Sequence, residues 1–501
     1  MKTKFMETVR NKIRSFLKIE PPSVNQIVIQ QRLDFCTNAV KNRIWYRGSS
    51  QEIAELYSQL DVPNTMFWKA SSTAGMEIRK IHTGLPALIV KVLANIIVND
   101  FDGVEIPNLS EQDIWDNIYK NNNGDELMKQ CLKDTLTVGD GAFKINFDKD
   151  IDEHYPIIEY RSGEYIEFVK KRGRVTEIIF ITEYISDRRK YTLKEHYGYG
   201  YVQYHLYTEN GSEINANAIP QTAWITSDTV EFDRNVMLAV PCIYGSSSMY
   251  DGRGENIFDS KIDSFDALDE AWSQWLDALR ANRTKEYIPE SLIPRDTTNG
   301  KPIRPNSFDN RFIAIGDDMS ERGMNKVQTE QSQIPHESYL ATYITALDLC
   351  LQGIVSPSTL GIDVKKMDNA EAQREKEKTT LYTRGNLVNF IDGVMQKLVL
   401  SALAGYHIWH NESFDGSLKC SVKFGEYANP SFEAVVETVS KAKTAGIMSV
   451  EACVEEMYGD SKEPSWKEEE IARLKAEQGV ITPDDDGITT DLGNFSVNVN
   501  G

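Results

Sequence analysis

The chain has 501 residues, of which 41% are hydrophobic and 26% charged, a composition typical of a folded protein with a sizeable core and several domains. Its formal net charge is −20. Proteins that grip DNA by neutralising phosphates are normally basic, so this charge disfavours a tight wrapper of nucleic acid. It leaves open a surface that nucleic acid slides past, or no contact with nucleic acid at all.

The six cysteines stand far apart, and none forms a CxxC pair. The sequence therefore lacks the spacing of a zinc or redox site, and we expect mostly buried free thiols in a reducing cytoplasm. No signal peptide is visible. The best apolar run, residues 85–98, is too short to span a bilayer and contains Lys91. We interpret it as a core helix.

Residues 1–23 are a basic arm, and residues 2–18 within it have the spacing of an amphipathic helix. Two roles stay open for this arm: lying on a membrane surface, or docking on a neighbouring protein surface, which the acidity of the rest favours. The pattern is helical from residue 24 to residue 137, and Pro86 either bends one helix or marks its true start. The helices predicted here cover residues 27–44, 52–60, 76–99 and 126–136.

From Gly139 to about Tyr244 the chain alternates and is rich in Val, Ile, Tyr, Phe and Thr, with turn signals at close spacing. This pattern predicts an antiparallel meander. The many tyrosines are compatible with a base-stacking platform, although half-buried tyrosines of a sheet are the commoner case.

Two helices are then predicted on either side of a small inserted segment, so that the helices form a stalk and the segment its tip. Residues 260–282 carry an apolar stripe beside an acidic one. Such a helix packs either on another helix, in the same chain or a neighbour, or on its own core. Residues 288–335 are too few to bury a core of their own, and contain one predicted strand at residues 311–315. The second helix is predicted over residues 337–352.

A breaker-rich loop over residues 353–361 precedes a long run without proline that ends at Trp409. At about 1.5 Å per residue, ~45 helical residues span roughly 65 Å, which no compact domain buries along its whole length. The first half of this run consists almost wholly of charged residues and good helix formers, and the second half is apolar at helical spacing. One half must lie in a core and the other in water or against a partner. Further along, a strand is predicted over residues 418–424, helices over 432–445, 449–457 and 465–477, and a disordered polar tail over 481–501.

Motifs that carry catalysis are missing from the sequence. There is no P-loop and no GxSxG nucleophile elbow. His407 and His410 form an HxxH pair without the HExxH pattern of helical zinc sites. The run DDDG at residues 484–487 lacks the glutamate of a calcium loop. No nucleophile is paired with a base. We therefore expect no catalytic residues, no metal site, no cofactor and no enzymatic activity.

Several short runs resemble the portal proteins of tailed double-stranded DNA bacteriophages, in particular those of siphophages of Gram-positive hosts. The order of predicted elements also matches that family over about residues 24–480. The runs are SPSTLGID at 356–363, NAEA at 369–372, EKE at 375–377, TTL at 379–381, and RKIHTGLP at 79–86, which leads into NIIV at 95–98.

The resemblance implies an α+β portal fold with a mixed α/β wing, a two-helix stem, a small α/β clip, a long wing helix and a helical crown. By position these parts are the wing at 24–259, stem helices at 260–282 and 334–354, the clip at 283–333, a tunnel loop at 355–366, the long wing helix and returning strand at 367–425, and the crown at 426–480.

The implied function is a ring, usually of twelve subunits, at one capsid vertex of the virion, assembled in the cytoplasm of the bacterial host. Double-stranded DNA passes through it without sequence-specific contacts, pumped by a separate terminase and later ejected. The implied partners are the terminase large subunit, head-completion or adaptor proteins, and the major capsid and scaffolding proteins, with no membrane. Two alternatives stay open: a capsid assembly scaffold or head–tail adaptor acting only through protein contacts, and, as the weakest, a nucleic-acid enzyme.

The resemblance also assigns candidate site residues. Acidic stem residues facing a channel would repel phosphate. Lys365 and Lys366 would make weak phosphate contacts, or else pair with acids one turn away. The tunnel-loop candidates are Val355, Ser356, Pro357, Ser358, Thr359, Leu360, Lys365 and Lys366. The channel-facing candidates are Asp259, Asp263, Asp266, Glu270 and Asp277. The clip candidates for terminase docking are Arg295, Lys301, Arg304 and Arg311. The intersubunit candidates are Glu371, Arg374, Glu375 and Lys378.

Overall fold

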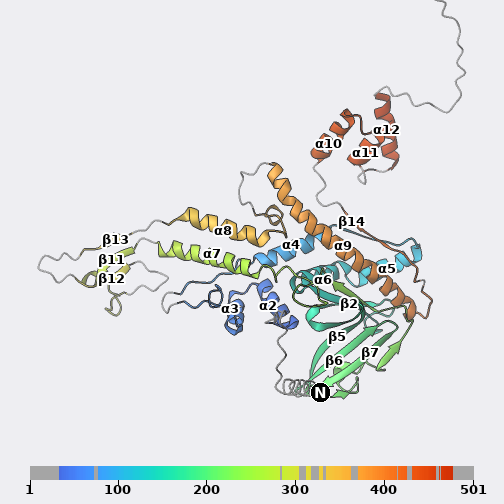
Figure 1. Cartoon of the computed structure of the whole chain (residues 1–501), viewed down its shortest axis with the longest axis horizontal. Helices are drawn as coiled ribbons and strands as arrows, with labels where there is room; N and C mark the ends of the chain where they lie inside the picture. Colours follow the sequence, from blue (N-terminus) through green and yellow to red (C-terminus); the bar gives the residue numbers. More distant parts are fainter. Residues whose placement is uncertain are drawn as a thin grey trace, which may run out of the picture. The chain divides into compact units, whose positions relative to one another are not determined.

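The computed structural model divides into two compact units, Met1–Gly425 and Glu426–Gly501, which are described separately (Figure 1). The predicted basic arm and the predicted polar tail both lie outside the described residues. The structure describes residues 33–72, 77–282, 285–303, 312–317, 326–330, 334–362, 370–414, 416–425, 432–458, 462 and 464–477.

The first unit begins with helices whose starts are set by local capping. Asp34 caps the first of them by accepting the Thr37 backbone N–H at 2.9 Å. The predicted helix over residues 76–99 begins only at Leu85, because Gly84 has φ +73° and Pro86 lies in the first turn, so this proline marks the true start. The helices are α2 (Phe35–Arg47), α3 (Ser50–Gln59), α4 (Leu85–Asn99), α5 (Leu109–Asn121) and α6 (Gly124–Val138).

Helix α4 is a core helix, as predicted from its apolar run. Ile89, Val90 and Ile97 are fully buried. The strand that follows it, β1 (Phe101–Glu105), was not predicted and interrupts the region predicted to be helical. Helix α5 lies within that region, although it was not predicted as a separate helix. β1 pairs antiparallel with β14 (Ser421–Phe424), more than 300 residues later. That partner is the strand predicted over residues 418–424, which is shorter than expected.

Two antiparallel sheets follow, in agreement with the predicted meander. One has the order β10-β2-β3; the other has the order β4-β5-β6-β7-β8, with β9 also pairing with β7. Tyr160 and Tyr197 are buried in the core, which confirms the sheet interpretation for these two tyrosines. The strands are β2 (Asp140–Asn146), β3 (Ile157–Ser162), β4 (Ile166–Lys171), β5 (Arg174–Ser186), β6 (Arg189–Gly198), β7 (Tyr201–Thr208), β8 (Glu213–Ile214), β9 (Thr229–Glu231) and β10 (Ala239–Ile243).

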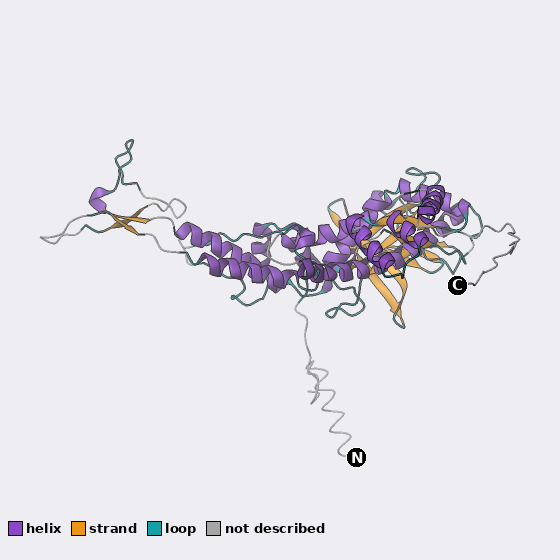
Figure 2. Cartoon of the chain, turned by 90° about the horizontal axis from the view of Figure 1, so that it is seen from above, coloured by secondary structure: helices purple, strands orange, loops and turns teal. Residues whose placement is uncertain are grey.

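The predicted stalk is a pair of helices, α7 (Ile262–Ala281) and α8 (His336–Leu351), which lie side by side in Figures 1 and 2. The segment between them contains a small sheet with the order β12-β11-β13. In this sheet β11 (Lys285–Pro289) pairs parallel with β12 (Phe312–Ile315) and antiparallel with β13 (Gln328–Glu330). Only β12 corresponds to a predicted strand.

Helix α9 (Ala370–Trp409) is one continuous helix of 40 residues. Its second half packs on β10, β2, α4 and α5, and its apolar side chains are buried, among them Leu387, Ile391 and Val399. Among the described residues, the segment Lys378–Trp409 is long and apolar enough to cross a membrane by length and composition, yet half of its most apolar window is buried inside the protein. This burial accounts for the apolar composition.

The second unit contains the three helices predicted near the C-terminus: α10 (Phe432–Thr444), α11 (Val450–Tyr458) and α12 (Pro464–Glu477). Val439, Cys453 and Val454 are buried. Tyr458 and Trp466 make an edge-to-face contact at 5.0 Å between ring centres, which fastens α11 to α12.

Candidate functional surface: the helical hairpin and its base

Helices α7 and α8 form an antiparallel hairpin, fastened at its base by one lysine. Lys261, immediately before α7, donates from Nζ to the carbonyl oxygens of Leu349 and Gln352, at 2.8 Å each. These carbonyls belong to the C-terminal end of α8, where the helix dipole favours a positive charge. The contact therefore joins the beginning of one helix to the end of the other.

Aromatic side chains hold the hairpin together further from the base. Trp272 lies 5.6 Å from Tyr343, and Trp275 is stacked on Tyr339 at 6.4 Å between ring centres. Nearer the base, Phe265 and Leu268 belong to the main hydrophobic core. Both alternatives left open by the sequence are thus realised: the first half of α7 packs on its own core and the second half on another helix of the same chain.

Two buried aspartates of α7 hold the helix to the rest of the unit by accepting hydrogen bonds. Asp269 is 0% exposed. Its Oδ1 accepts hydrogen bonds from the Thr83 N–H and hydroxyl, at 2.8 and 3.0 Å. Its Oδ2 accepts the Trp68 indole N–H at 3.1 Å and lies 2.7 Å from His82 Nδ1. Asp266 accepts the backbone N–H groups of Phe67 and Trp68. Burial raises the pKa of the Asp266 carboxyl, and these two N–H groups lower it.

These contacts correct the predicted set of channel-facing acids. Asp266 is buried, and a ring can only bury it further, so it is not a channel-facing residue. Asp259 precedes α7 and accepts hydrogen bonds from the amides of Asn38, Asn42 and Asn256, so its carboxylate is also committed to the interior. The remaining candidates lie on α7 itself: Asp263 is exposed, while Glu270 and Asp277 are half-buried.

The prediction for the first two residues of the tunnel loop is also wrong. Val355 and Ser356 are buried, so they cannot line a channel. The Ser356 N–H donates to Thr380 Oγ1 at 2.9 Å, Thr359 Oγ1 lies 3.0 Å from the same hydroxyl, and Thr383 donates to the Ile354 carbonyl at 2.6 Å. We call this set the threonine clamp.

Beyond the clamp the segment reaches the surface. Residues Ser358–Leu360 form a short 3-10 helix, in which Ser358 is exposed and Thr359 and Leu360 are half-buried, as is Pro357 before them. Lys365 and Lys366 lie outside the described residues.

The tip of the hairpin carries the clip candidates that the structure describes. Arg295 donates to the Gly300 carbonyl at 3.3 Å, and Arg295 and Lys301 lie in an exposed turn. A hollow of about 490 Å³, lined in part by Asp277, Lys285 and Tyr339, lies where the hairpin meets the tip. Arg304 and Arg311 lie outside the described residues, as do the side chains of Glu371, Arg374 and Glu375. Lys378 is exposed on α9.

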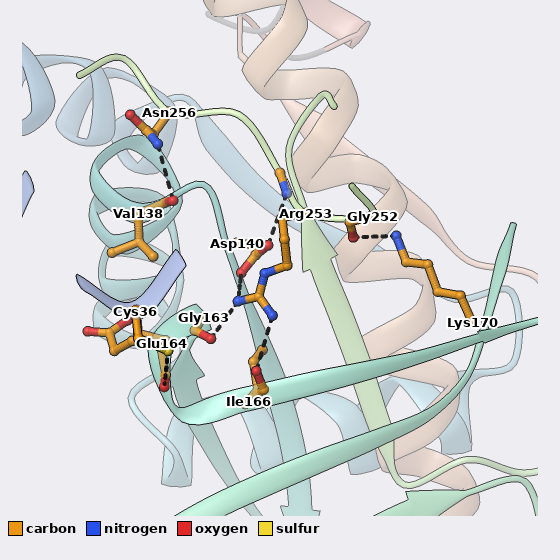
Figure 3. Close-up of polar contacts among 12 residues, drawn as sticks. Cys36, Val138, Asp140, Gly163, Glu164, Ile166, Lys170, Gly252, Arg253 and Asn256 are labelled. Atoms are coloured by element: carbon orange, nitrogen blue, oxygen red, sulfur yellow. Dashed lines mark hydrogen bonds and ion pairs between the residues drawn. The ribbon is translucent and has the colours of Figure 1, made fainter. Parts of the chain in front are cut away.

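A second fastening point, shown in Figure 3, joins the sheet to the chain that leads into α7. Arg253 donates to Asp140 at 2.8 Å and to the carbonyls of Gly163 and Ile166, and its guanidinium lies 3.6 Å from the centre of the Phe35 ring. Burial lowers the pKa of Arg253 and Asp140 raises it. The Asp140 carboxylate also accepts the Gly254 N–H at 2.9 Å.

Sequence reasoning missed Asp269, His82 and Arg253. For Asp269 a signal existed: it lies seven residues after Ile262 and seven before Leu276, so it occupies the apolar face rather than the acidic one. An acid in that position needs buried donors. His82 and Arg253 had no such signal, because their carboxylate partners, Asp269 and Asp140, lie more than 100 residues away along the chain.

The HxxH pair is engaged in hydrogen bonds. His407 has one ring nitrogen 2.9 Å from Glu412 and the other 3.0 Å from Glu111, and His410 donates to the Tyr406 carbonyl. Within the described part of the chain, no group of three or more His, Cys, Asp or Glu side chains is arranged to hold a metal ion.

Comparison with known proteins gave matches only among solved structures: no family profile and no curated protein matches the chain. Three structures are chains of gene transfer agent particles. One is from the virion of the native particle (14% identity, 73% of this chain and 86% of that chain covered, TM-score 0.37). The second is from the neck of the empty particle, computed with C6 symmetry (12%, 73% and 87%, 0.37). The third is from the neck of the native particle, computed with C12 symmetry (12%, 77% and 88%, 0.36). TM-scores this low do not establish a shared fold.

Proposed function

We propose that this chain is the portal-type connector of a tailed, phage-like particle. It would form a ring at one capsid vertex of the virion, through which double-stranded DNA is packaged by a separate terminase and later ejected. One observation carries the proposal: the α7–α8 hairpin bears a small sheet at its far end and is followed by a 40-residue helix, in the order that the family resemblance implies.

Three leucines of the hairpin remain about half exposed among the described residues. Leu279 on α7 and Leu340 and Leu349 on α8 are 49%, 43% and 50% exposed. Exposed apolar side chains of this kind would be covered at a protein interface. In a ring each subunit offers two different complementary faces to its neighbours. Neighbouring hairpins would cover these leucines.

The same arrangement would leave acidic side chains of α7 facing the axis. Asp263, Glu270 and Asp277 remain as candidates after the correction above. Negative charge there would keep phosphates from binding during translocation. This role needs no catalytic centre in the chain, because the terminase would supply the chemistry. The tip, with Arg295 and Lys301, would meet the terminase large subunit and later the head-completion proteins, and the body would meet the capsid and scaffolding proteins.

The ring is tested by negative-stain imaging of the purified full chain. We expect a ring with a central hole, and its loss in the variant Leu340→Glu/Leu349→Glu. The control is Ile185→Glu, which changes an even more exposed apolar residue on the six-stranded sheet. A monomer at all concentrations and salts would contradict the proposal.

A particle-assembly assay distinguishes a DNA conduit from a scaffold that acts only through protein contacts. Ser358→Trp alters the exposed part of the predicted tunnel loop. Lys365→Glu/Lys366→Glu removes the phosphate contacts predicted for that loop. A conduit predicts assembled but empty heads for these variants, with normal DNA content for Ile185→Trp. Heads filled normally in all three would favour a scaffold or adaptor that acts only through protein contacts.

A further inference from the structure

Four side chains form a row across four neighbouring strands of the six-stranded sheet. They are Glu177 on β5, His196 on β6, His205 on β7 and Glu213 on β8. His196 Nδ1 makes a hydrogen bond with Glu177, and His205 Nδ1 makes one of 2.6 Å with Glu213. The two imidazole rings lie 5.0 Å apart between centres, with their planes at 75° to each other. The row therefore reads carboxylate, imidazole, imidazole, carboxylate.

The strand register places this row on the open face of the sheet. His205 is opposite Lys194, two residues from His196, so the two histidines are diagonal neighbours on one face. Leu193 and Leu206 point to the opposite face, where they are buried in a separate hydrophobic cluster. The side chains of His196 and His205 are 21% and 32% exposed, so solvent reaches both.

The hydrogen bonds fix which ring nitrogen is available. An ionised carboxylate only accepts, so each Nδ1 carries a proton and each neutral ring keeps its lone pair on Nε2. Neither Nε2 has a protein hydrogen-bond partner among the described residues. The two glutamates lie on opposite sides of the histidine pair, so the Nδ1 edges face outward to β5 and β8. With the Nδ1 edges engaged on the outer sides, we expect the Nε2 edges to face the space between β6 and β7.

This is the arrangement in which histidines bind metal ions. Metal-bound imidazoles usually donate their second N–H to a carboxylate, which fixes the tautomer and orients the ring. With Zn–N bonds of about 2.0 Å and tetrahedral angles, two imidazoles on one ion have ring centres about 5 Å apart. The observed separation of the two rings matches this value.

The local charge also fits a divalent cation. With both rings neutral, Glu177 and Glu213 leave two negative charges on this part of the sheet. Lys194, which is opposite His205 on the same face, is already paired with Glu167 at 3.3 Å. Two protonated rings would compensate the carboxylates as well, but would place two like charges 5.0 Å apart.

We propose that His196 and His205 form a binding site for a divalent transition-metal ion, foremost Zn²⁺, through their Nε2 atoms, with water completing the coordination. Imidazole is a preferred ligand for this class of ion. The site joins β6 to β7, and because only the folded sheet brings the rings together, the ion stabilises the folded state by mass action. This inference does not depend on the proposed role in a particle.

The test is calorimetric titration of Zn²⁺ into the untagged full-length chain carrying Cys36→Ser, which removes the exposed thiol. We expect saturable binding with a stoichiometry of one and a rise in thermal midpoint on adding Zn²⁺. Both should be lost in His196→Ala and in His205→Ala. The matched control, His154→Ala/His336→Ala, removes two exposed histidines elsewhere and should bind as the parent does.

A second pair of variants tests the carboxylates. Glu177→Gln and Glu213→Gln should each weaken Zn²⁺ binding by about 10- to 100-fold without abolishing it. Absence of saturable binding to the parent would overturn the proposal, as would stoichiometric binding retained in either single histidine variant. In that case the row consists of two imidazolium–carboxylate ion pairs. Circular dichroism of each variant before titration verifies that the sheet is intact.

Discussion

Asp269 and His82 meet in the protein core, 187 residues apart along the chain, with the carboxylate oxygen 2.7 Å from Nδ1 of the ring. Asp269 belongs to the first helix of the hairpin, and His82 lies just before the core helix α4. The contact therefore ties the hairpin to the body of the first unit. In the proposed ring, this contact would hold the stem helix α7 in a fixed position relative to the wing.

The first prediction concerns Asp269. Asp269→Asn removes one of the acceptor oxygens from a buried set of donors, and leaving buried donors unpaired is costly. We expect the free energy of unfolding to fall by about 3 kcal/mol, measured by urea denaturation. Asp263→Asn, a change of the same chemistry at an exposed position of the same helix, should stay within about 0.5 kcal/mol of the parent. Equal effects of the two changes would refute the assigned role of Asp269.

The second prediction concerns the shape of Arg253. A lysine keeps the charge but cannot donate to Asp140 and two carbonyls while stacking on Phe35. Arg253→Lys should lower the free energy of unfolding by about 2 kcal/mol or more. The control Arg174→Lys, in an exposed position of β5, should have no measurable effect. Full stability of Arg253→Lys would mean that the charge alone suffices.

The third prediction concerns the threonine clamp. Thr380→Val keeps the shape of the side chain but leaves the buried Ser356 N–H without its acceptor, at a cost of about 1–3 kcal/mol. Limited proteolysis should then cut within residues 352–362 faster than in the parent. Thr345→Val, on the exposed face of α8, is the control and should change neither quantity. Unchanged proteolysis in Thr380→Val would show that the segment is held by other contacts.

The fourth prediction concerns the hairpin itself. Trp275 and Tyr339 are stacked, so a double-mutant cycle with alanine at both positions should give a coupling energy of about 0.5–1.5 kcal/mol. The same cycle between Trp275 and Tyr165, an exposed residue at the start of β4, should give none. A coupling of zero in the first cycle would mean that the two helices do not pack through these rings in solution.

The fifth prediction concerns thiol reactivity. Burial raises the pKa of Cys350 to about 12, so at pH 8 the thiolate fraction is on the order of 10⁻⁴. Partial burial and the nearby Asp34 also raise the pKa of the exposed Cys36. A chromogenic disulfide reagent should therefore react first with Cys36, at a rate that still rises above pH 9, and with Cys350 only after unfolding. Cys36→Ser should remove the fastest phase, and a fast phase that survives it would contradict this assignment.

The sequence by itself determined the elements that rest on local chemistry. The proline-free run predicted one long helix, and the apolar stripe of residues 262–279 predicted α7. The alternation after Gly139 predicted the antiparallel sheet. Hydrophobic periodicity, helix-breaking residues and capping residues depend only on residues close together in the sequence, so they can be recognised without knowing the fold. The same holds for α10, α11 and α12.

Tertiary structure alone decided which polar residues are internal. Asp266 and Asp263 are the same residue type on the same helix, yet one is buried and the other exposed, because only one faces the segment that contains Phe67 and Trp68. The pairing of β1 with β14, the buried start of the predicted tunnel loop and the row from Glu177 to Glu213 likewise depend on partners distant in the chain. A hydrogen bond between distant residues leaves no periodic trace in the sequence, whereas the burial of an apolar stripe does.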